Sequence, residues 1–302
     1  MINSDSIKIS IFTPTFNRAY ILENLYNSLV LQIYTNFEWL IVDDGSTDNT
    51  EKLVEKFINE RKLDIKYIKQ KNGGKHRAIN RGLQEARGEL FFIVDSDDTL
   101  PSISLERVLF YYEQIRFDKR FAGVVGHRGY PNGGVIGNGM KQMYLDSDIL
   151  GRRYVYDIQG DMAKVLRTNI FKQFLFPEID GENFVGESLV WNKMALHYKF
   201  RYFNEIIYYT TYREDGLTFN SVKNRRKNKE YTHLLYKELS EIQTVPLKYR
   251  FKAMINLWRF ALCNNLILTR VFFKIKNNPI LIFALPMGVL LYLKDCFTLK
   301  SK

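Results

Sequence analysis

The chain has 302 residues, of which 46 % are apolar and 25 % charged, and its formal net charge is +11. This length suits one large catalytic domain or a core domain with an appendage, and the average composition excludes disordered, fibrous and disulfide-stapled classes. Cys263 and Cys296 lie far apart with no metal-ligand spacing, so neither a disulfide framework nor a zinc site is predicted. The N-terminus lacks the charged and apolar regions of a signal peptide, and a reducing, cytosolic protein is expected.

The first hundred residues alternate short apolar runs with amphipathic segments. Runs of strand length lie at 7–13, 37–42, 65–70 and 89–94, with helical patterns between them at 19–31, 51–60 and 75–87. Pro14 is expected to end the first strand. Four strands alternating with helices predict an α/β fold with a mostly parallel, doubly wound sheet.

The residues that directly follow these strands are unusually polar. Residues 14–18 follow the first strand, 43–46 the second and 95–98 the fourth. Ligands of open α/β sheets bind outside the carboxyl ends of the strands. We therefore expect the three segments to converge on one binding edge.

The aspartate cluster after the fourth strand is costly because its like charges repel. Asp95, Asp97 and Asp98 offer only oxygen ligands, which suit Mg²⁺ or Mn²⁺ together with substrate phosphates. The alternative is that Ser96 and Asp98 cap the following turn. Asp44 lies in a run that is typical of tight turns, so it too could be either a functional carboxylate or a turn residue.

A Gly-Gly loop precedes the third expected helix. Gly73 and Gly74 are followed by Lys75 and Arg77, so that backbone N–H groups and cations are available to a phosphate at the helix start. Such a loop is a weak signal by itself. The functional interpretation depends on the order in which this loop and the two acidic strand ends follow one another along the chain.

That order matches a known family. The segments ISIFTPTFNR, VDDGSTDNT and NGGKHRAINRGLQEARGELFFIVDSDD together resemble the family 2 inverting glycosyltransferases, which carry a GT-A nucleotide-sugar-binding domain. The resemblance is close over residues 7–100, weakens over 100–215, and gives no guidance beyond.

The resemblance implies roles for individual residues. Pro14 and Thr15 lie where the family's first loop lines the nucleotide, and Asp44 lies where an acidic residue reads the uracil base. Lys75 takes the place of a basic residue that contacts the diphosphate. Asp95-Ser96-Asp97 matches the DxD motif, whose first Asp lies near the ribose and whose second, Asp97, binds a Mn²⁺ or Mg²⁺ ion that bridges the diphosphate. The predicted nucleotide-sugar site comprises Pro14, Thr15, Asn17, Arg18, Asp44, Lys75, Asp95 and Ser96.

The resemblance also implies a catalytic base. The family carries a Glu-Asp pair just before a helix, and the matching residues are Glu187 and Ser188, with Ser where Asp is more common. Glu187 is predicted to take the proton of the acceptor hydroxyl, with Glu182 and Asp180 as alternatives. A first-turn acid that favours the helix N-terminus is the other interpretation of Glu187. Candidate acceptor contacts, which core packing explains equally well, are Tyr208, Tyr209, Tyr212 and Arg213-Glu214-Asp215-Gly216.

The positive charge is confined to the end of the chain. Residues 1–215 hold 28 basic and 29 acidic side chains, net −1, whereas residues 216–302 hold 16 and 4, net +12. The uncharged run at 279–293 is shorter than the roughly 17 to 25 residues of a membrane span and is interrupted by Pro286. Residues 251–276 mix aromatic and basic side chains as helices on anionic lipid do. A peripheral membrane anchor is expected, and the alternative is a helical extension packed on the catalytic domain. No nucleic-acid partner is expected, because long apolar runs do not suit a phosphate backbone.

These observations define the expected protein. Residues 1–220 would form the GT-A domain and 221–302 a helical, basic, membrane-associated region, on the cytoplasmic face of the cell membrane. The expected activity is metal-dependent, inverting, hexosyl-type transfer from a UDP-sugar to a glycan or lipid-linked acceptor in cell-surface polysaccharide synthesis. The alternative, which Ser188 suggests, is a non-catalytic nucleotide-sugar-binding scaffold subunit. A nucleotidyltransferase is disfavoured because the first strand does not lead into a Gly-rich basic loop.

Overall fold

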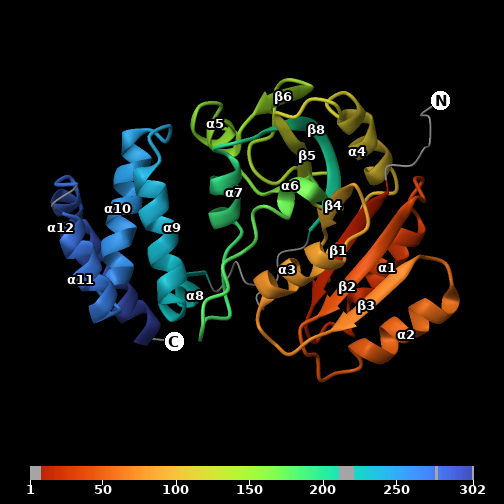
Figure 1. Ribbon diagram of the computed structural model, residues 1–302, viewed down its shortest axis with the longest axis horizontal. Helices are drawn as coiled ribbons and strands as arrows, with labels where there is room; N and C mark the ends of the chain where they lie inside the picture. The colour runs from red at the N-terminus through yellow and green to blue at the C-terminus, as the bar shows by residue number, and fades with distance from the viewer. Residues whose placement is uncertain (1–7, 211–220, 276–277, 301–302) are drawn as a thin grey trace. The chain divides into compact units, whose positions relative to one another are not determined.

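The computed structural model describes residues 8–210, 221–275 and 278–300 (Figure 1). The chain divides into two compact units. The first unit contains Met1–Phe176 and Val190–Tyr212, and the second contains Pro177–Leu189 and Arg213–Lys302. We describe each unit by itself.

The first unit begins with the predicted βα repeats. They are β1 (Ile9–Thr15), α1 (Leu22–Val30), β2 (Phe37–Asp43), α2 (Thr50–Glu60), β3 (Ile65–Lys69), α3 (Lys75–Glu85) and β4 (Leu90–Ile93). The strands pair in parallel in the order β3-β2-β1-β4. The mostly parallel α/β sheet expected from the sequence is confirmed.

The rest of the first unit extends the same sheet. Its elements are α4 (Ser104–Glu113), β5 (Phe121–Gly129), β6 (Tyr144–Ser147), α5 (Ile149–Tyr154), β7 (Met162–Arg167), α6 (Thr168–Phe171), α7 (Ser188–Met194), which begins in the second unit, and β8 (Lys199–Tyr209). The full strand order is β3-β2-β1-β4-β7-β5-β8-β6, with β7 antiparallel to β4 and β5, and β6 antiparallel to β8. The carboxyl ends of β5 and β8 and the amino end of β7 therefore lie at the same edge as the carboxyl ends of β1, β2 and β4.

Pro14 does not end the first strand, contrary to the sequence prediction. β1 continues to Thr15, and Pro14 is registered against Val42 of β2. On the other side, β4 pairs with β1 only as far as Phe12. At Pro14, β1 therefore pairs with β2 alone. Proline is tolerated there because its nitrogen, which carries no hydrogen, can face the side that has no paired strand.

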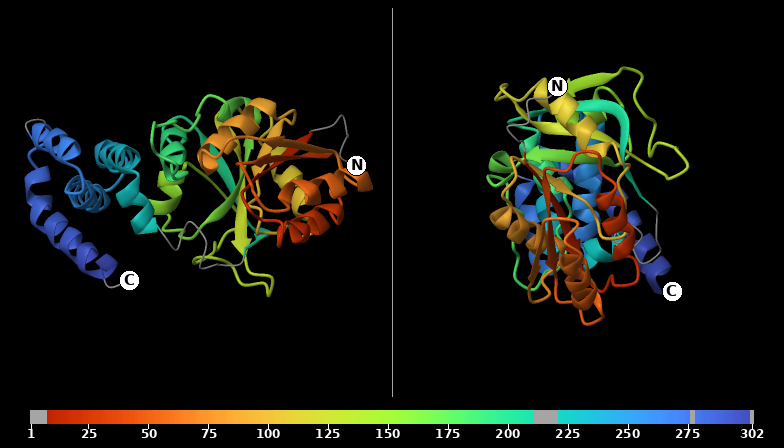
Figure 2. Two further views of the ribbon diagram at one scale, coloured as in Figure 1. Left: turned by 90° about the horizontal axis from the view of Figure 1, so that it is seen from below. Right: turned by 90° about the vertical axis from the view of Figure 1, so that its right-hand side faces the viewer.

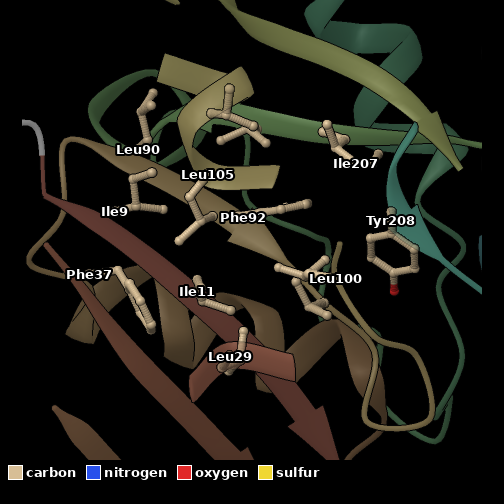
Figure 3. Close-up of a cluster of buried hydrophobic side chains, with 14 of the residues drawn as sticks. Ile9, Ile11, Leu29, Phe37, Leu90, Phe92, Leu100, Leu105, Ile207 and Tyr208 are labelled. Atoms are coloured by element: carbon tan, nitrogen blue, oxygen red, sulfur yellow. The ribbon is translucent and has the colours of Figure 1, made fainter. Parts of the chain in front are cut away.

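Apolar side chains cover both faces of the sheet. On one face Ile11 and Phe92 lie in a buried cluster with Leu29 of α1 and Leu105 of α4 (Figure 3). On the other, the ring of Phe91 stacks on Phe12 and meets Phe171 edge-on, with centroids 5.1 and 5.8 Å apart. Each fully buried side chain of this size stabilises the fold by about 1.5 to 3 kcal/mol. The sheet is thus a rigid base for the residues at its edge.

The second unit is helical in its described part. It contains α8 (Ser221–Lys227), α9 (Lys229–Glu241), α10 (Leu247–Ala261), α11 (Asn265–Lys274) and α12 (Leu281–Lys300) (Figures 1 and 2). α10 packs against α9, α11 and α12. At the centre, Trp258 is fully buried and its Nε1 donates to the Leu281 carbonyl at 2.7 Å. The predicted helical nature of residues 221–302 agrees with these elements.

The segment Pro177–Leu189, which we had expected within the transferase domain, belongs to the second unit. The Glu182 carboxylate accepts the backbone N–H groups of Glu230 and Tyr231 at 2.7 and 2.9 Å, at the start of α9. The four free N–H groups of a helix N-terminus favour such an acceptor. This contact ties the segment to α9.

α12 runs through Pro286, which the sequence analysis had taken as an interruption. Pro286 lies in the second turn, where it removes a single backbone bond, while Ala284 is buried in the helical core and Gly288 lies tightly against Trp258 on α10. Within the described residues one helical window, Leu281–Thr298, is long and apolar enough to cross a membrane, with mean hydropathy 1.6 and 22 % of it buried.

Candidate active site

The loops after β1 and β2 are locked together by Asn17. Its φ of 53° is left-handed, a conformation that Asn adopts more readily than most residues. Its Oδ1 accepts the Thr47 N–H at 2.8 Å, and its own N–H donates to Ser46 Oγ at 2.8 Å. The structure thus gives Asn17 a supporting role that the sequence did not indicate, and its predicted contact with the nucleotide stays a prediction.

Asp44 organises the Gly-Gly loop. Its two carboxylate oxygens accept the N–H groups of Gly73 and Gly74 at 2.9 and 2.7 Å, and Gln70 Nε2 donates to Oδ1 at 2.8 Å. Gly74 has a φ of 95°, which disfavours any side chain there. Asp44 therefore fixes the loop that precedes Lys75, and base recognition through this carboxylate stays a prediction.

Asp95 is the best neutralised carboxylate of the cluster. Lys75, the first residue of α3, places its Nζ 2.6 Å from Asp95 Oδ1, and Arg128 lies 3.8 Å from Oδ2. Burial works to raise the pKa of Asp95, but the charges of Lys75 and Arg128 outweigh it and hold the pKa below its usual value. The first residue after the Gly-Gly loop thus contacts the DSD segment, Asp95-Ser96-Asp97.

Asp97 lacks comparable compensation. Its nearest ion-pair partner in the described residues is Arg18, at 3.8 Å. Burial, and after it the charge of Asp95, raises the pKa of Asp97, and Arg18 opposes this shift only in part. A carboxylate in this position gains from an additional cation. The predicted role of Asp97 as a metal ligand stays a prediction.

Asp98 is hydrogen-bonded to β8 and to the residue that follows it. Tyr208 O–H donates to its Oδ2 at 2.7 Å and Thr210 Oγ1 donates to Oδ1 at 2.6 Å, while the Asp95 N–H donates to the Tyr208 hydroxyl oxygen at 2.9 Å. Burial, reinforced by the charge of Asp95, raises the pKa of Asp98 to about 6 despite these bonds. Asp98 and Tyr208 thus brace the DSD segment against β8.

Sequence reasoning missed Arg128, which stands at the centre of the cluster. It is 13 % exposed at the end of β5, 3.7 Å from Asp98 and 3.4 Å from Asp161, with its guanidinium carbon 4.1 Å from the centroid of the Tyr208 ring. Asp161 comes from the start of β7 and also lies 3.8 Å from Lys164. The available signal was a charged residue within the otherwise apolar run FAGVVGHRG.

The other predicted donor-site residues lie at the expected strand ends. Pro14 and Thr15 end β1, and Ser96 follows β4; all three are buried. The Thr15 hydroxyl is buried and has no hydrogen-bond partner among the described residues, so that a ligand group could satisfy it. Arg18 begins the turn into α1, where its N–H donates to Thr50 Oγ1 at 3.1 Å.

The candidate bases fall in the second unit. Glu182 is engaged at the start of α9 and is buried, which argues against it as a base. Asp180 is exposed, and Glu187 is partly buried directly before α7. Of the three, Glu187 best keeps the features of an accessible carboxylate at a helix start. Tyr212 and residues 213–216, the predicted acceptor contacts, lie outside the described residues.

The carboxylates suit a hard divalent ion bound partly by substrate. Within the described ranges no group of three or more His, Cys, Asp or Glu side chains has metal-binding geometry. Mg²⁺ and Mn²⁺ commonly use one or two carboxylates and complete their shell with phosphate oxygens and water. Asp97, with its raised pKa, and neighbouring Asp95 fit that kind of ion.

The fold and this edge define a class of protein. The profile described as "Glycosyl transferase family 2" matches residues 10–175, and the chain belongs to this family.

Two relatives show how far the similarity extends. The chain is 31 % identical over 176 residues to the poly(ribitol-phosphate) beta-N-acetylglucosaminyltransferase TarS of Staphylococcus aureus, a match that covers 57 % of this chain and 30 % of TarS. It is 27 % identical over 245 residues to the GalNAc(5)-diNAcBac-PP-undecaprenol beta-1,3-glucosyltransferase of Campylobacter jejuni, covering 78 % of this chain and 74 % of the relative. The chain therefore spans less than a third of the first relative's length.

Solved structures agree on the fold. The crystal structure of S. aureus TarS 1-349 in complex with UDP-GlcNAc superposes with a TM-score of 0.63 at 24 % identity, over 94 % of this chain and 81 % of that one. The mannosyltransferase PcManGT of Pyrobaculum calidifontis, in complex with GDP-Man and Mn²⁺, gives a TM-score of 0.56 at 17 % identity. The expected GT-A fold is confirmed.

Proposed function

We propose that this protein transfers a sugar from a UDP-sugar to a glycan or lipid-linked acceptor in the synthesis of a cell-surface polysaccharide. The observation that carries the proposal is the convergence of Lys75, Asp95, Asp97 and Arg128 on one sheet edge. The named activities of the two relatives support the substrate class. A UDP donor is supported by the solved complexes of TarS with UDP-GlcNAc and UDP.

The charges of this edge are arranged to accept an anionic donor. Four carboxylates and four cations form the described network: Asp95, Asp97, Asp98 and Asp161, with Arg18, Lys75, Arg128 and Lys164. A Mn²⁺ or Mg²⁺ ion held by Asp97, with Asp95 beside it, would supply positive charge to the departing diphosphate. Lys75 contributes a second positive charge in the same place, because departure of the nucleotide builds negative charge there.

Glu187 is proposed as the base. Its carboxylate takes the proton of the acceptor hydroxyl while that oxygen attacks the anomeric carbon, and the bond to the diphosphate breaks on the opposite face. A single displacement inverts the anomeric configuration. A product that keeps the donor's configuration would overturn this mechanism.

The test is release of UDP from a panel of UDP-sugars, with Mn²⁺ and membrane extract as the source of acceptor. Wild type should turn over one donor, and Asp97→Asn and Glu187→Gln should lower kcat by roughly a hundredfold or more. Asp180→Asn, which alters the exposed alternative candidate seven residues before Glu187, should remain active; its inactivation together with an active Glu187→Gln would assign the base to Asp180. Donor binding without turnover, with every extract tried, would favour the non-catalytic scaffold subunit instead.

The second unit is proposed to lie on the cytoplasmic face of the cell membrane. Phe273 of α11 and Phe283 and Phe297 of α12 are 68 %, 74 % and 75 % exposed, in a region with an excess of basic residues. Exposed aromatic side chains among Lys and Arg are typical of interfacial helices. Phe283→Ser should weaken binding to anionic vesicles, whereas Phe117→Ser, at an 89 % exposed position of the first unit, should not.

A further inference from the structure

The second unit contains a cavity that none of the proposed catalytic residues uses. Its volume is about 540 Å³, within the range of small-ligand sites. It is open to the surface and is bordered by α9, α10, the end of α11 and the start of α12. The side chains that define its chemistry are Lys237, Glu241, Arg250, Leu257, Lys274 and Leu281.

The lining of this cavity is cationic. Three basic side chains face one carboxylate, and that carboxylate, Glu241, is already paired with Lys274. Arg250 is fixed by two bonds, from Nε to the Ser240 carbonyl at 3.1 Å and from Nη1 to Gln243 Oε1 at 2.9 Å. The wall is therefore positively charged and partly preorganised.

Lys237 brings a positive charge to the cavity that no carboxylate neutralises. It is partly buried, and in the part of the chain that the structure describes its ammonium makes no ion pair or side-chain hydrogen bond. An anion in the cavity would supply a counter-charge and a charge-assisted hydrogen bond. A singly or doubly charged phosphate group matches the net charge of the lining.

Exposed apolar side chains lie on two of the helices that border the cavity, α11 and α12. Leu257 and Leu281 are part of its wall. Phe273 directly precedes Lys274, and Phe283 follows Leu281 by two residues; both are more than two-thirds exposed. A ligand with a phosphate group and attached hydrocarbon chains meets both features, whereas free phosphate meets only the first.

We propose that this cavity binds the phosphate headgroup of an anionic membrane lipid, whose hydrocarbon chains lie against α11 and α12. The inference rests on the proposed membrane association of the second unit. It replaces a general electrostatic attraction to anionic lipid with binding of a headgroup at one site. It does not depend on sugar transfer, because none of its residues belongs to the candidate active site.

The test compares two lysines of the full-length protein. Lys237→Gln removes the one cavity lysine that has no ion pair in the described residues, and Lys248→Gln removes an exposed lysine of α10 that does not line the cavity. Binding is measured by co-flotation with vesicles of phosphatidylcholine, with and without phosphatidylglycerol. Lys237→Gln should weaken binding to the phosphatidylglycerol vesicles roughly tenfold, the effect of one lost charge-assisted hydrogen bond, and Lys248→Gln should change it less than about twofold.

Each other outcome overturns the inference in a defined way. Equal losses in the two variants would mean general electrostatic attraction without a headgroup site. If inorganic phosphate binds in a Lys237-dependent manner while vesicle binding is the same in wild type and Lys237→Gln, the ligand is a soluble phosphate. If Phe283→Ser lowers vesicle binding but Lys237→Gln does not, the membrane association stands and the cavity site falls. Retained UDP release in Lys237→Gln separates all of these results from the proposed transferase activity.

Discussion

The two units bury ionic clusters of opposite design. In the first, Arg128 lies 3.4 to 3.8 Å from three carboxylates, at the open edge of a sheet. In the second, Asp295 is 7 % exposed, and Arg259 donates to both of its oxygens at 2.8 and 2.6 Å while Arg226 lies 3.6 Å away. The second cluster is closed by direct contacts between helices. Buried charge alone therefore does not mark a site, and it is the raised pKa values of Asp97 and Asp98 at the sheet edge that favour a site there.

The sharpest way to break this comparison is to unfold one unit and examine the other. Trp258→Ala removes a fully buried indole and its bond to the Leu281 carbonyl. We expect the second unit to lose about 4 to 5 kcal/mol of unfolding free energy. Calorimetry should show the transition of the second unit moving to lower temperature, while UDP affinity, which we propose belongs to the first unit, should be unchanged. A loss of UDP affinity in Trp258→Ala would mean that the two units do not behave independently.

The second unit also carries a pH dependence of its own. Burial lowers the pKa of His233 to about 4; Glu230 opposes this shift, and Lys274, Arg270 and Lys237 add to it. The unfolded chain takes up a proton below about pH 6.5, whereas the folded state does so only near pH 4. Stability is therefore full above pH 6.5 and falls as the pH drops to 4, by at most about 3 kcal/mol.

His233→Gln isolates this effect. The unfolding free energy of the second unit is measured between pH 7 and pH 4 in wild type and variant. As the pH falls, the wild type should lose more unfolding free energy than the variant. Parallel curves for the two proteins would show that His233 titrates normally in the folded state.

The third prediction concerns the brace at the sheet edge. Tyr208→Phe removes the donor to Asp98 and the acceptor of the Asp95 N–H. We expect the first unit to lose about 2 kcal/mol and UDP to bind more weakly, because buried polar groups are left unpaired. Denaturant unfolding and UDP titration measure the two effects. Tyr209→Phe, which removes a neighbouring hydroxyl with no described partner, should leave both unchanged.

The predictable part of the first unit is the part whose signal is local. β1 and β2 are buried along their whole length, so they appear in the sequence as continuous apolar runs bounded by polar turns. The DSD segment and Lys75 could be assigned to one site because the order of their segments resembles that of the family 2 glycosyltransferases. Pro14 does not end β1 as predicted, because its tolerance depends on where β4 stops pairing, which local sequence does not specify.

The rest of the site depends on long-range pairing. Arg128 and Asp161 reach the edge only because β7 and β5 insert between β4 and β8, an order that no local pattern specifies. Glu182 was an alternative base because it lies in the acidic cluster that precedes Glu187 in the sequence. It became a helix-capping group through contact with a helix that starts 47 residues later, at Lys229.

The smallest predicted effect compares two matched acids, one in each unit. Glu51 and Glu230 each lie in the first turn of a helix, and each pairs with an exposed cation at 2.7 Å, Lys69 and Arg270 respectively. As isolated pairs, either Glu→Gln change should cost about 0.5 kcal/mol. Glu230, however, is one of only 4 acidic residues among 16 basic ones in residues 216–302. Its removal should cost more than that of Glu51 at low salt, and the difference should vanish near 1 M salt, where the Debye length is about 3 Å. A difference that persists in high salt would show that local contacts, and not the charge of the second unit, set the value of the pair.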